Sequence, residues 1–170
     1  MMTKEIYLAG GCFWGTEHFM KQLRGVVDTT VGYANGHHDK APTYQEVCTG
    51  ATGFAETVRV AYDSEVIDLA LILRLYFRTI DPTSLNKQGG DIGTQYRTGI
   101  YYTDEADLEV ITTALKELAS LYTAELCIEC EPLRNFYPAE DYHQGYLDAN
   151  PGGYCHIGQD LFILAREANR

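Results

Sequence analysis

The residues best suited to chemistry are Cys12 and its neighbours in the stretch 10–15. The apolar run 6–9 before it predicts a strand, and residues 12–23 predict a helix. Cys12 would then lie in the first helical turn, where unpaired N–H groups and the helix dipole favour the nucleophilic thiolate. Phe13 and Trp14 place two aromatic side chains beside the sulfur, which suits a small apolar group held next to a reactive thiolate. The alternative is a buried core cysteine between two core aromatics.

Length, composition and charge indicate one acidic domain that spans residues 1–170. The 170 residues are 45% hydrophobic, and 24 acidic against 13 basic residues give a net charge of −11. Such a charge argues against nucleic acid and against anionic membrane surfaces as partners. The most apolar window, 66–77, is too short to span a bilayer and contains Asp68 and Arg74.

The five cysteines are an odd number, which excludes a fully paired disulfide scaffold. No secretory signal is visible at the N-terminus, so reduced thiols in the cytoplasm are expected. Any disulfide that forms there is then expected to be catalytic.

The hydrophobic pattern predicts an α+β fold with alternating strands and helices. The predicted strands are 3–9, 26–33, 56–62, 98–102 and 125–131, and the predicted helices are 12–23, 65–80, one after a cap at 103–105, and 138–148. The order strand, helix, strand, strand, helix, strand is typical of the ferredoxin-like split βαβ core. We therefore expect a mixed, mainly antiparallel sheet, followed by an additional helix, a strand and an irregular C-terminal arm, about 134–170.

Four stretches outside these elements hold unusual residues. They are 11–15, 42–48 with 52–56, 91–97, and 136–144 running on to 153–155. Together they resemble the A-type methionine sulfoxide reductases, in the expected order and over nearly the whole chain. This enzyme class reverses the oxidation of methionine.

The resemblance implies a role for each matching residue in the reduction of methionine sulfoxide. Cys12 matches the family's nucleophile and Glu56 its acid, whose pKa an apolar pocket would raise so that the carboxyl can donate a proton. The remaining matches form the rest of the site. Tyr44 and Tyr96 match hydroxyls that bind the sulfoxide oxygen, Asp91 matches a residue that orders the site, and Phe13 and Trp14 match the pocket for the S-methyl group.

The resemblance also implies how the enzyme is regenerated. Cys155, in a glycine-rich tail, matches the resolving cysteine, which would condense with a sulfenic acid on Cys12. Thioredoxin, or dithiothreitol in an assay, would reduce the resulting disulfide, with no cofactor and no metal. The expected substrate is the S epimer of methionine sulfoxide, free or in proteins.

The sequence departs from the family's common pattern at Phe54 and Ile92, where histidine is frequent, and both changes are expected to make the site more apolar. Cys48 is expected to be a buried thiol, and His143 and His156 are expected to be structural. No cysteine follows Cys155, so the reductant is expected to attack the Cys12–Cys155 disulfide directly.

Two other functions remain open from the residues alone. A thiol peroxidase would also pass through a sulfenic acid on Cys12, but it would not need the aromatic pocket. A non-enzymatic metal-binding module could use Cys127, Cys130, Cys155 and His156.

Overall fold

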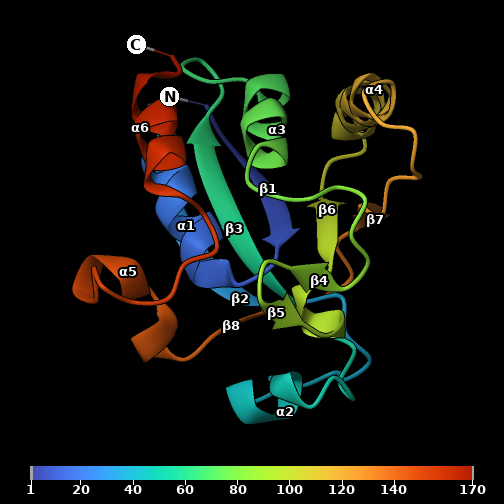
Figure 1. Ribbon diagram of the computed structural model, residues 1–170, viewed down its shortest axis with the longest axis vertical. Helices are drawn as coiled ribbons and strands as arrows, with labels where there is room; N and C mark the ends of the chain where they lie inside the picture. Colours follow the sequence, from blue (N-terminus) through green and yellow to red (C-terminus); the bar gives the residue numbers. More distant parts are fainter. Residues whose placement is uncertain (1, 170) are drawn as a thin grey trace.

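The centre of the structure, a computed structural model that describes residues 2–169, is a sheet in the order β7–β6–β1–β3–β2–β8 (Figure 1). All neighbouring strands are antiparallel except β6 and β7. The strands are β1 (Thr3–Gly10), β2 (Val26–Ala34), β3 (Ala55–Asp63), β6 (Thr98–Tyr102), β7 (Glu129–Pro132) and β8 (Phe136–Pro138). The four strands β6–β1–β3–β2 confirm the split βαβ core and the mainly antiparallel sheet.

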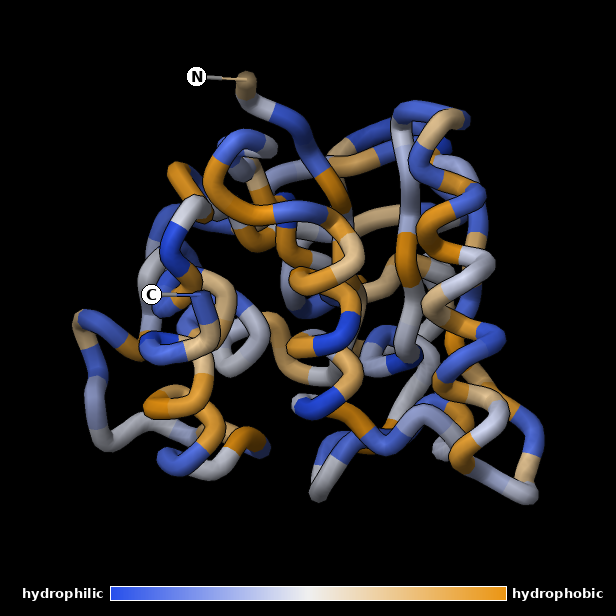
Figure 2. The backbone as a smooth tube through the Cα atoms, turned by 90° about the horizontal axis from the view of Figure 1, so that it is seen from above, coloured by the Kyte–Doolittle hydropathy of each residue, from blue (hydrophilic) through white to orange (hydrophobic). Residues whose placement is uncertain are grey.

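The alternation along β1 explains why this strand lies in the middle of the sheet. Ile6 and Leu8 are fully buried in the main core, which the helices α1 (Phe13–Lys21), α3 (Leu69–Phe77) and α4 (Asp107–Ala119) cover. Tyr7 and Ala9 point to the opposite face, where Phe136 packs edge-on against Tyr7 with ring centroids 5.0 Å apart. Hydrophobic stretches accordingly gather in the middle of the molecule, and the turns at its rim are mostly hydrophilic (Figure 2).

The predicted helix over 138–148 is wrong. Pro138 ends β8, which pairs with the edge of β2, and the chain continues through a 3₁₀ turn (Asp141–His143) into a short helix, α5 (Tyr146–Ala149). Pro138 suits the end of an edge strand because its missing N–H removes no hydrogen bond from the interior of a sheet. Gly145, with φ = 62°, prevents one continuous helix.

Other boundaries also differ from the prediction. The strand predicted over 125–131 begins only at Glu129, because the N–H of Cys127 is bound to the carbonyl of Pro82 (2.7 Å). The helix predicted over 65–80 begins after the cap Asp68, whose side chain accepts a hydrogen bond from the N–H of Leu71 (2.8 Å). Several short elements have no signal in the hydrophobic pattern and were not predicted. These are α2 (Tyr44–Cys48), the hairpin of β4 (Lys87–Gln88) and β5 (Asp91–Ile92), the 3₁₀ turn η1 (Thr94–Tyr96) and α6 (Gln159–Glu167).

The C-terminal arm is held to the core by two polar side chains, the half-buried Gln144 and the buried Glu17. The Gln144 side chain makes the two hydrogen bonds to β2 that a neighbouring strand would make. Its Oε1 accepts from the N–H of Val31 (2.9 Å), and its Nε2 donates to the Val31 carbonyl (2.8 Å). Glu17, only 3% exposed, accepts from the Thr29 hydroxyl (2.9 Å) and from the N–H of Gly145 (2.8 Å). The arm therefore contains fixed secondary structure and is less irregular than predicted.

No helix formed by residues 2–169 is long and apolar enough to cross a membrane.

Replacing Gln144 with alanine is expected to destabilise the protein. The change leaves the N–H and carbonyl of Val31, a fully buried residue, without these two partners. The expected loss in unfolding free energy is about 1–3 kcal/mol, measured by urea denaturation. Gln45→Ala, at an exposed position on α2, is the control and should leave the midpoint unchanged. Equal midpoints for both variants would contradict this anchoring role.

Candidate active site

Cys12 lies where β1 ends and α1 begins. It is the cap residue of α1, with φ = −60° and ψ = 125°, so it precedes the first helical turn, and it is 7% exposed. Gly11 before it has φ = 84°, and a Cβ there would lie 2.8 Å from Cβ of Gln88. Only glycine fits this close approach, which aims Cys12 at the strand ends.

Glu56 lies beside Cys12 and is held by the same turn. The N–H of Phe13 donates to its Oε1 (3.2 Å), while Oε2 is buried with no hydrogen-bond partner among residues 2–169. The side chain is 1% exposed, and burial raises the pKa of Glu56 to about 8, against the lowering effect of the Phe13 hydrogen bond and with a further rise from Asp91. The carboxyl is therefore protonated at neutral pH and has one oxygen free to donate.

The protonation state of Cys12 differs from the prediction made from the sequence, which was a thiolate. This difference concerns the site without substrate. The N–H of Trp14 does lower the pKa of the thiol, as a helix start should. Burial raises it more, and the neighbouring Glu56 carboxylate raises it further, so the net shift is upward. Without substrate, the site therefore holds two protons, one on the Cys12 sulfur and one on Glu56.

Tyr44, Tyr96 and Asp91 come from three separate segments to this site. Burial raises the pKa of both hydroxyls, and the Glu56 carboxylate is the next largest cause for each. Asp91 also acts on Tyr96 and Cys12, and its Oδ2 is buried with no hydrogen-bond partner among residues 2–169. The structure thus groups two protonated hydroxyls and the Asp91 carboxyl group around Glu56, beside Cys12.

Phe13 and Trp14 belong to an aromatic cluster that the arm completes. The Trp14 indole stacks on Tyr146 (centroids 3.9 Å apart, 14° between planes), and its Nε1 donates to Nδ1 of His143 (3.0 Å). The His143 ring is 5.3 Å from the Phe13 ring and 4.5 Å from the Tyr44 ring. Burial lowers the pKa of His143 against the effect of Glu140, so its Nδ1 can accept from the indole.

Glu140 is a positioning residue that the sequence analysis did not single out. Its Oε1 accepts from the Tyr33 hydroxyl (2.8 Å), and its Oε2 accepts from the N–H of Tyr44 (3.0 Å). It therefore ties the start of α2 to the arm and to β2. The only signal in the sequence was an acidic residue within the motif 136–144, and sequence spacing does not indicate a contact with a residue 96 positions away.

Cys155 packs against the first turn of α1. A Cβ on Gly15 would lie only 3.0 Å from its Sγ, and Cys155 contributes to the raised pKa of Cys12, after the larger effects of burial and Glu56. The Sγ accepts from the N–H of Ile157 (3.4 Å). The predicted resolving cysteine thus lies close enough to Cys12 to raise the pKa of its thiol.

The other cysteines lie outside this group. Cys48 is exposed, because α2 lies at the edge of the molecule, so the expectation of a buried thiol is wrong (Figure 1). Cys127 and Cys130 are half-buried free thiols near β7. Residues 2–169 contain no group of three or more potential metal ligands, so the residues suggested for a metal-binding module are not assembled.

Phe54 and Ile92, the two departures from the family pattern, differ in how far they make the site apolar. Phe54 is 1% exposed and packs edge-on against Tyr137 (5.8 Å), so it adds apolar volume next to β3. Ile92 is 70% exposed and therefore does little to bury Glu56, contrary to expectation.

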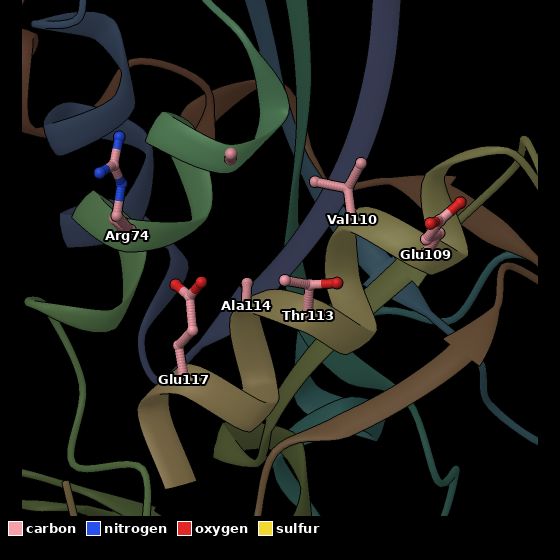
Figure 3. Close-up of a pocket in the computed structure, with 7 residues that line it drawn as sticks. Arg74, Glu109, Val110, Thr113, Ala114 and Glu117 are labelled. Carbon is pink, nitrogen blue, oxygen red and sulfur yellow. The ribbon is translucent and has the colours of Figure 1, made fainter. Parts of the chain in front are cut away.

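A surface groove of about 400 Å³ lies between α3 and α4, away from the candidate site (Figure 3). Arg74 of α3 and Glu117 of α4 line it, with the Arg74 side chain pointing away from Glu117, and Glu109 lies nearer the start of α4. None of the predicted site residues lines this groove.

Comparison with known proteins gives the family. The family model described as peptide methionine sulfoxide reductase matches residues 4–168. The peptide methionine sulfoxide reductase MsrA of Lachnoclostridium phytofermentans is 58% identical over 98% of this chain and 100% of its own length. A crystal structure of Mxr1 from Saccharomyces cerevisiae in reduced form has a TM-score of 0.87 and 42% identity, covering 92% of this chain and 91% of that one. Mxr1 in complex with Trx2 is also similar, with a TM-score of 0.61, 32% identity and coverage of 85% and 84%.

The α+β fold and its buried cysteine–carboxyl pair define a thiol-based oxidoreductase. The chain belongs to the peptide methionine sulfoxide reductase family, and it is an enzyme that reduces methionine sulfoxide.

Proposed function

We propose that the protein reduces the S epimer of methionine sulfoxide, free or in proteins, with Cys12 as nucleophile and Glu56 as acid. The observation that carries this assignment is the buried Glu56 carboxyl, with a pKa of about 8, fixed next to Cys12 by the N–H of Phe13. In such a site the sulfur of Cys12 attacks the sulfoxide sulfur while Glu56 protonates the sulfoxide oxygen, which makes that oxygen a leaving group. The oxygen leaves as water with the protons of Cys12 and Glu56, and a sulfur–sulfur bond joins Cys12 to the substrate as a sulfonium. Water then attacks the Cys12 sulfur, this bond breaks, a proton returns to Glu56, and the products are methionine and a sulfenic acid on Cys12.

The remaining side chains bind the two ends of the sulfoxide group. The hydroxyls of Tyr44 and Tyr96 donate to the oxygen, and their raised pKa values keep them protonated for this role. Asp91 orders this polar side of the site. Phe13 and Trp14 hold the S-methyl group, and the stack of Trp14 on Tyr146 fixes the indole for it.

Cys155 then attacks the sulfenic acid, and thioredoxin reduces the Cys12–Cys155 disulfide. Support comes from the packing of Cys155 against α1 and from the similarity to Mxr1, which has been solved in complex with Trx2. The reductant is external, so the scheme requires no resident cofactor or metal. Five free cysteines suit a reducing compartment such as the cytoplasm.

The direct test is an assay of each sulfoxide epimer with dithiothreitol. We expect turnover of the S epimer and none of the R epimer, measured as methionine released. Activity on neither epimer would overturn the proposal. Rapid reduction of hydrogen peroxide in place of sulfoxide would favour the thiol peroxidase.

Cys155→Ser should separate the two halves of the cycle. The reaction with sulfoxide needs only the groups around Cys12, so the variant should still release about one methionine per enzyme in a single turnover. It should stop there with thioredoxin, because it cannot form the intramolecular disulfide, and should cycle again with dithiothreitol, a small thiol that reduces the sulfenic acid itself. Mass spectrometry should find one added oxygen on Cys12. Normal cycling with thioredoxin would remove Cys155 from the resolving role.

A further inference from the structure

His156 follows the resolving cysteine, and its imidazole is enclosed by the segment that carries the nucleophile. Its Nε2 lies 3.4 Å from the place where a Cβ on Gly11 would be, and its Cε1 lies 3.4 Å from a Cβ on Gly15. On the other side, its own Cβ lies 3.2 Å from a Cβ on Gly89. Three glycines therefore leave the space that the ring fills, and two of them flank Cys12 in sequence.

The two ring nitrogens of His156 are buried. The Gly10 carbonyl lies close enough to the ring to raise its pKa, but neither nitrogen makes a hydrogen bond of good geometry within residues 2–169. Buried polar groups are normally paired, so an unpartnered imidazole next to two reactive thiols calls for an explanation. Burial lowers the pKa of His156, against the opposite effects of the Asp91 carboxylate and the Gly10 carbonyl. At neutral pH the ring is therefore uncharged and has a free lone pair.

The thiol of Cys155 needs a base in this environment. Burial raises its pKa, and the N–H of Ile157 offsets this only in part, so Cys155 is a thiol at neutral pH. Its Sγ lies 3.0 Å from the Cβ position of Gly15, the same point that Cε1 of His156 approaches to 3.4 Å. The sulfur and the imidazole thus flank one point on the first turn of α1. The thiol proton here points to the carbonyl of Ile157 (3.5 Å), so its transfer to His156 requires the S–H group to rotate away from this carbonyl.

We propose that His156 accepts the proton of Cys155 while this thiol attacks the sulfenic acid on Cys12, a role that rests on the proposed function. A sulfur–sulfur bond forms, and the sulfur–oxygen bond of the sulfenic acid breaks. The proton taken by His156 leaves with the departing hydroxide as water, and the ring returns to its neutral form. The Cys12 sulfur is reduced and the Cys155 sulfur is oxidised, so this step needs no outside reagent.

His156→Asn tests the proposal in a single turnover without reductant, with methionine release and loss of free thiols followed separately. Methionine release should match wild type, while disulfide formation at neutral pH should slow by about 10²–10⁴-fold, the usual contribution of a general base. His37→Asn is the matched control, because His37 is exposed in the loop after β2, outside the site and the arm, and this change should leave both rates unchanged. Wild-type disulfide formation in His156→Asn would overturn the proposal. No methionine release from wild type would instead overturn the proposed function.

The pH profile distinguishes proton transfer from mere packing. The titratable groups that face this region are Asp91 on β5, Cys12 at the start of α1, and Tyr154 and Cys155 on the arm. In wild type, disulfide formation should be nearly flat above the lowered pKa of His156 and fall below it. In His156→Asn the rate should follow the Cys155 thiolate and rise about tenfold per pH unit between about pH 6 and pH 9. A loss by the same factor at every pH would mean that His156 only packs.

Added imidazole provides a second variant for the same question. His156→Ala leaves the slot between the glycines open, so imidazole in solution should restore disulfide formation in proportion to its unprotonated fraction. Restoration requires that the missing function is proton transfer, since a free base cannot re-anchor the arm. Failure of imidazole to restore the rate in a folded variant would count against the proposal, as would a wild-type rate that does not fall at low pH.

Discussion

Replacing Cys12 with serine is expected to abolish methionine sulfoxide reduction with every reductant while the fold survives. A serine hydroxyl is almost fully protonated at neutral pH and is a poor nucleophile toward sulfur. Cys48, whose thiol pKa is raised by burial and by Glu56, is exposed, unlike the buried Cys12. The site around it should not collapse, because Glu56 is held by the backbone N–H of Phe13 and not by the thiol. The measurement is methionine released per enzyme, in a single turnover and at steady state.

Cys127→Ser is the control for this change, because Cys127 is a free thiol that lies before β7 and outside the active-site group. It should retain wild-type activity. Appreciable turnover by Cys12→Ser would place the nucleophile elsewhere, and exposed Cys48 would be the next residue to replace.

Glu56→Gln should slow sulfenic acid formation by about 10²–10⁴-fold at neutral pH, the range that general acid catalysis contributes. The amide keeps the shape and can donate a hydrogen bond, but it cannot deliver a proton to the sulfoxide oxygen. In wild type this step should slow as the pH rises past about 8, where Glu56 ionises. The variant should lack that decline and should recover partly at acidic pH, where solvent supplies the proton. Glu109→Gln, on the exposed face of α4, should behave as wild type.

The same substitution should make the folded protein more stable. The pKa of Glu56 is about 8 in the folded state and near the ordinary value of 4.5 when unfolded, so between these values the folded state binds more protons. Wild-type stability therefore decreases as the pH rises from 4.5 to about 8, and Glu56→Gln escapes this loss. Urea unfolding at a series of pH values measures the difference. Equal curves for the two proteins would mean that burial does not raise the pKa of Glu56.

The strands and helices around β1 were predictable because their patterns are strong and local. Ile6 and Leu8 alternate with Tyr7 and Ala9, as a strand buried on two faces requires. The failures lie where distant contacts outweigh local preference. Pro138 can begin a helix, but its segment pairs instead with β2, more than 100 residues earlier in the chain.

In the candidate site, too, the contacts between distant parts of the chain could not be predicted from the sequence. Its motifs were visible in the sequence because each is a short run of residues, and Cys12 and Glu56 lie together as their roles require. The supporting contacts were not visible, since Glu140 and His143 reach residues about 100 positions or more away. The protonation state of the Cys12 thiol could not be predicted from its place at a helix start. Burial raises the thiol pKa by more than the helix dipole lowers it.

The anchoring of the arm has a kinetic consequence for the oxidised enzyme. Asp148 at one end is paired with Lys21 (2.8 Å), and Phe162 at the other packs edge-on against His18 (4.6 Å), so α1 holds both ends of the loop 150–158 that carries Cys155. A thiol confined in this way acts at an effective concentration of about millimolar or more. In the proposed mechanism, a sulfenic acid on Cys12 meets this thiol before it meets a second oxidant molecule, and oxidation to sulfinic acid is irreversible for most proteins. The two clamps on α1 therefore shorten the interval in which the enzyme can be lost to the damage that it repairs.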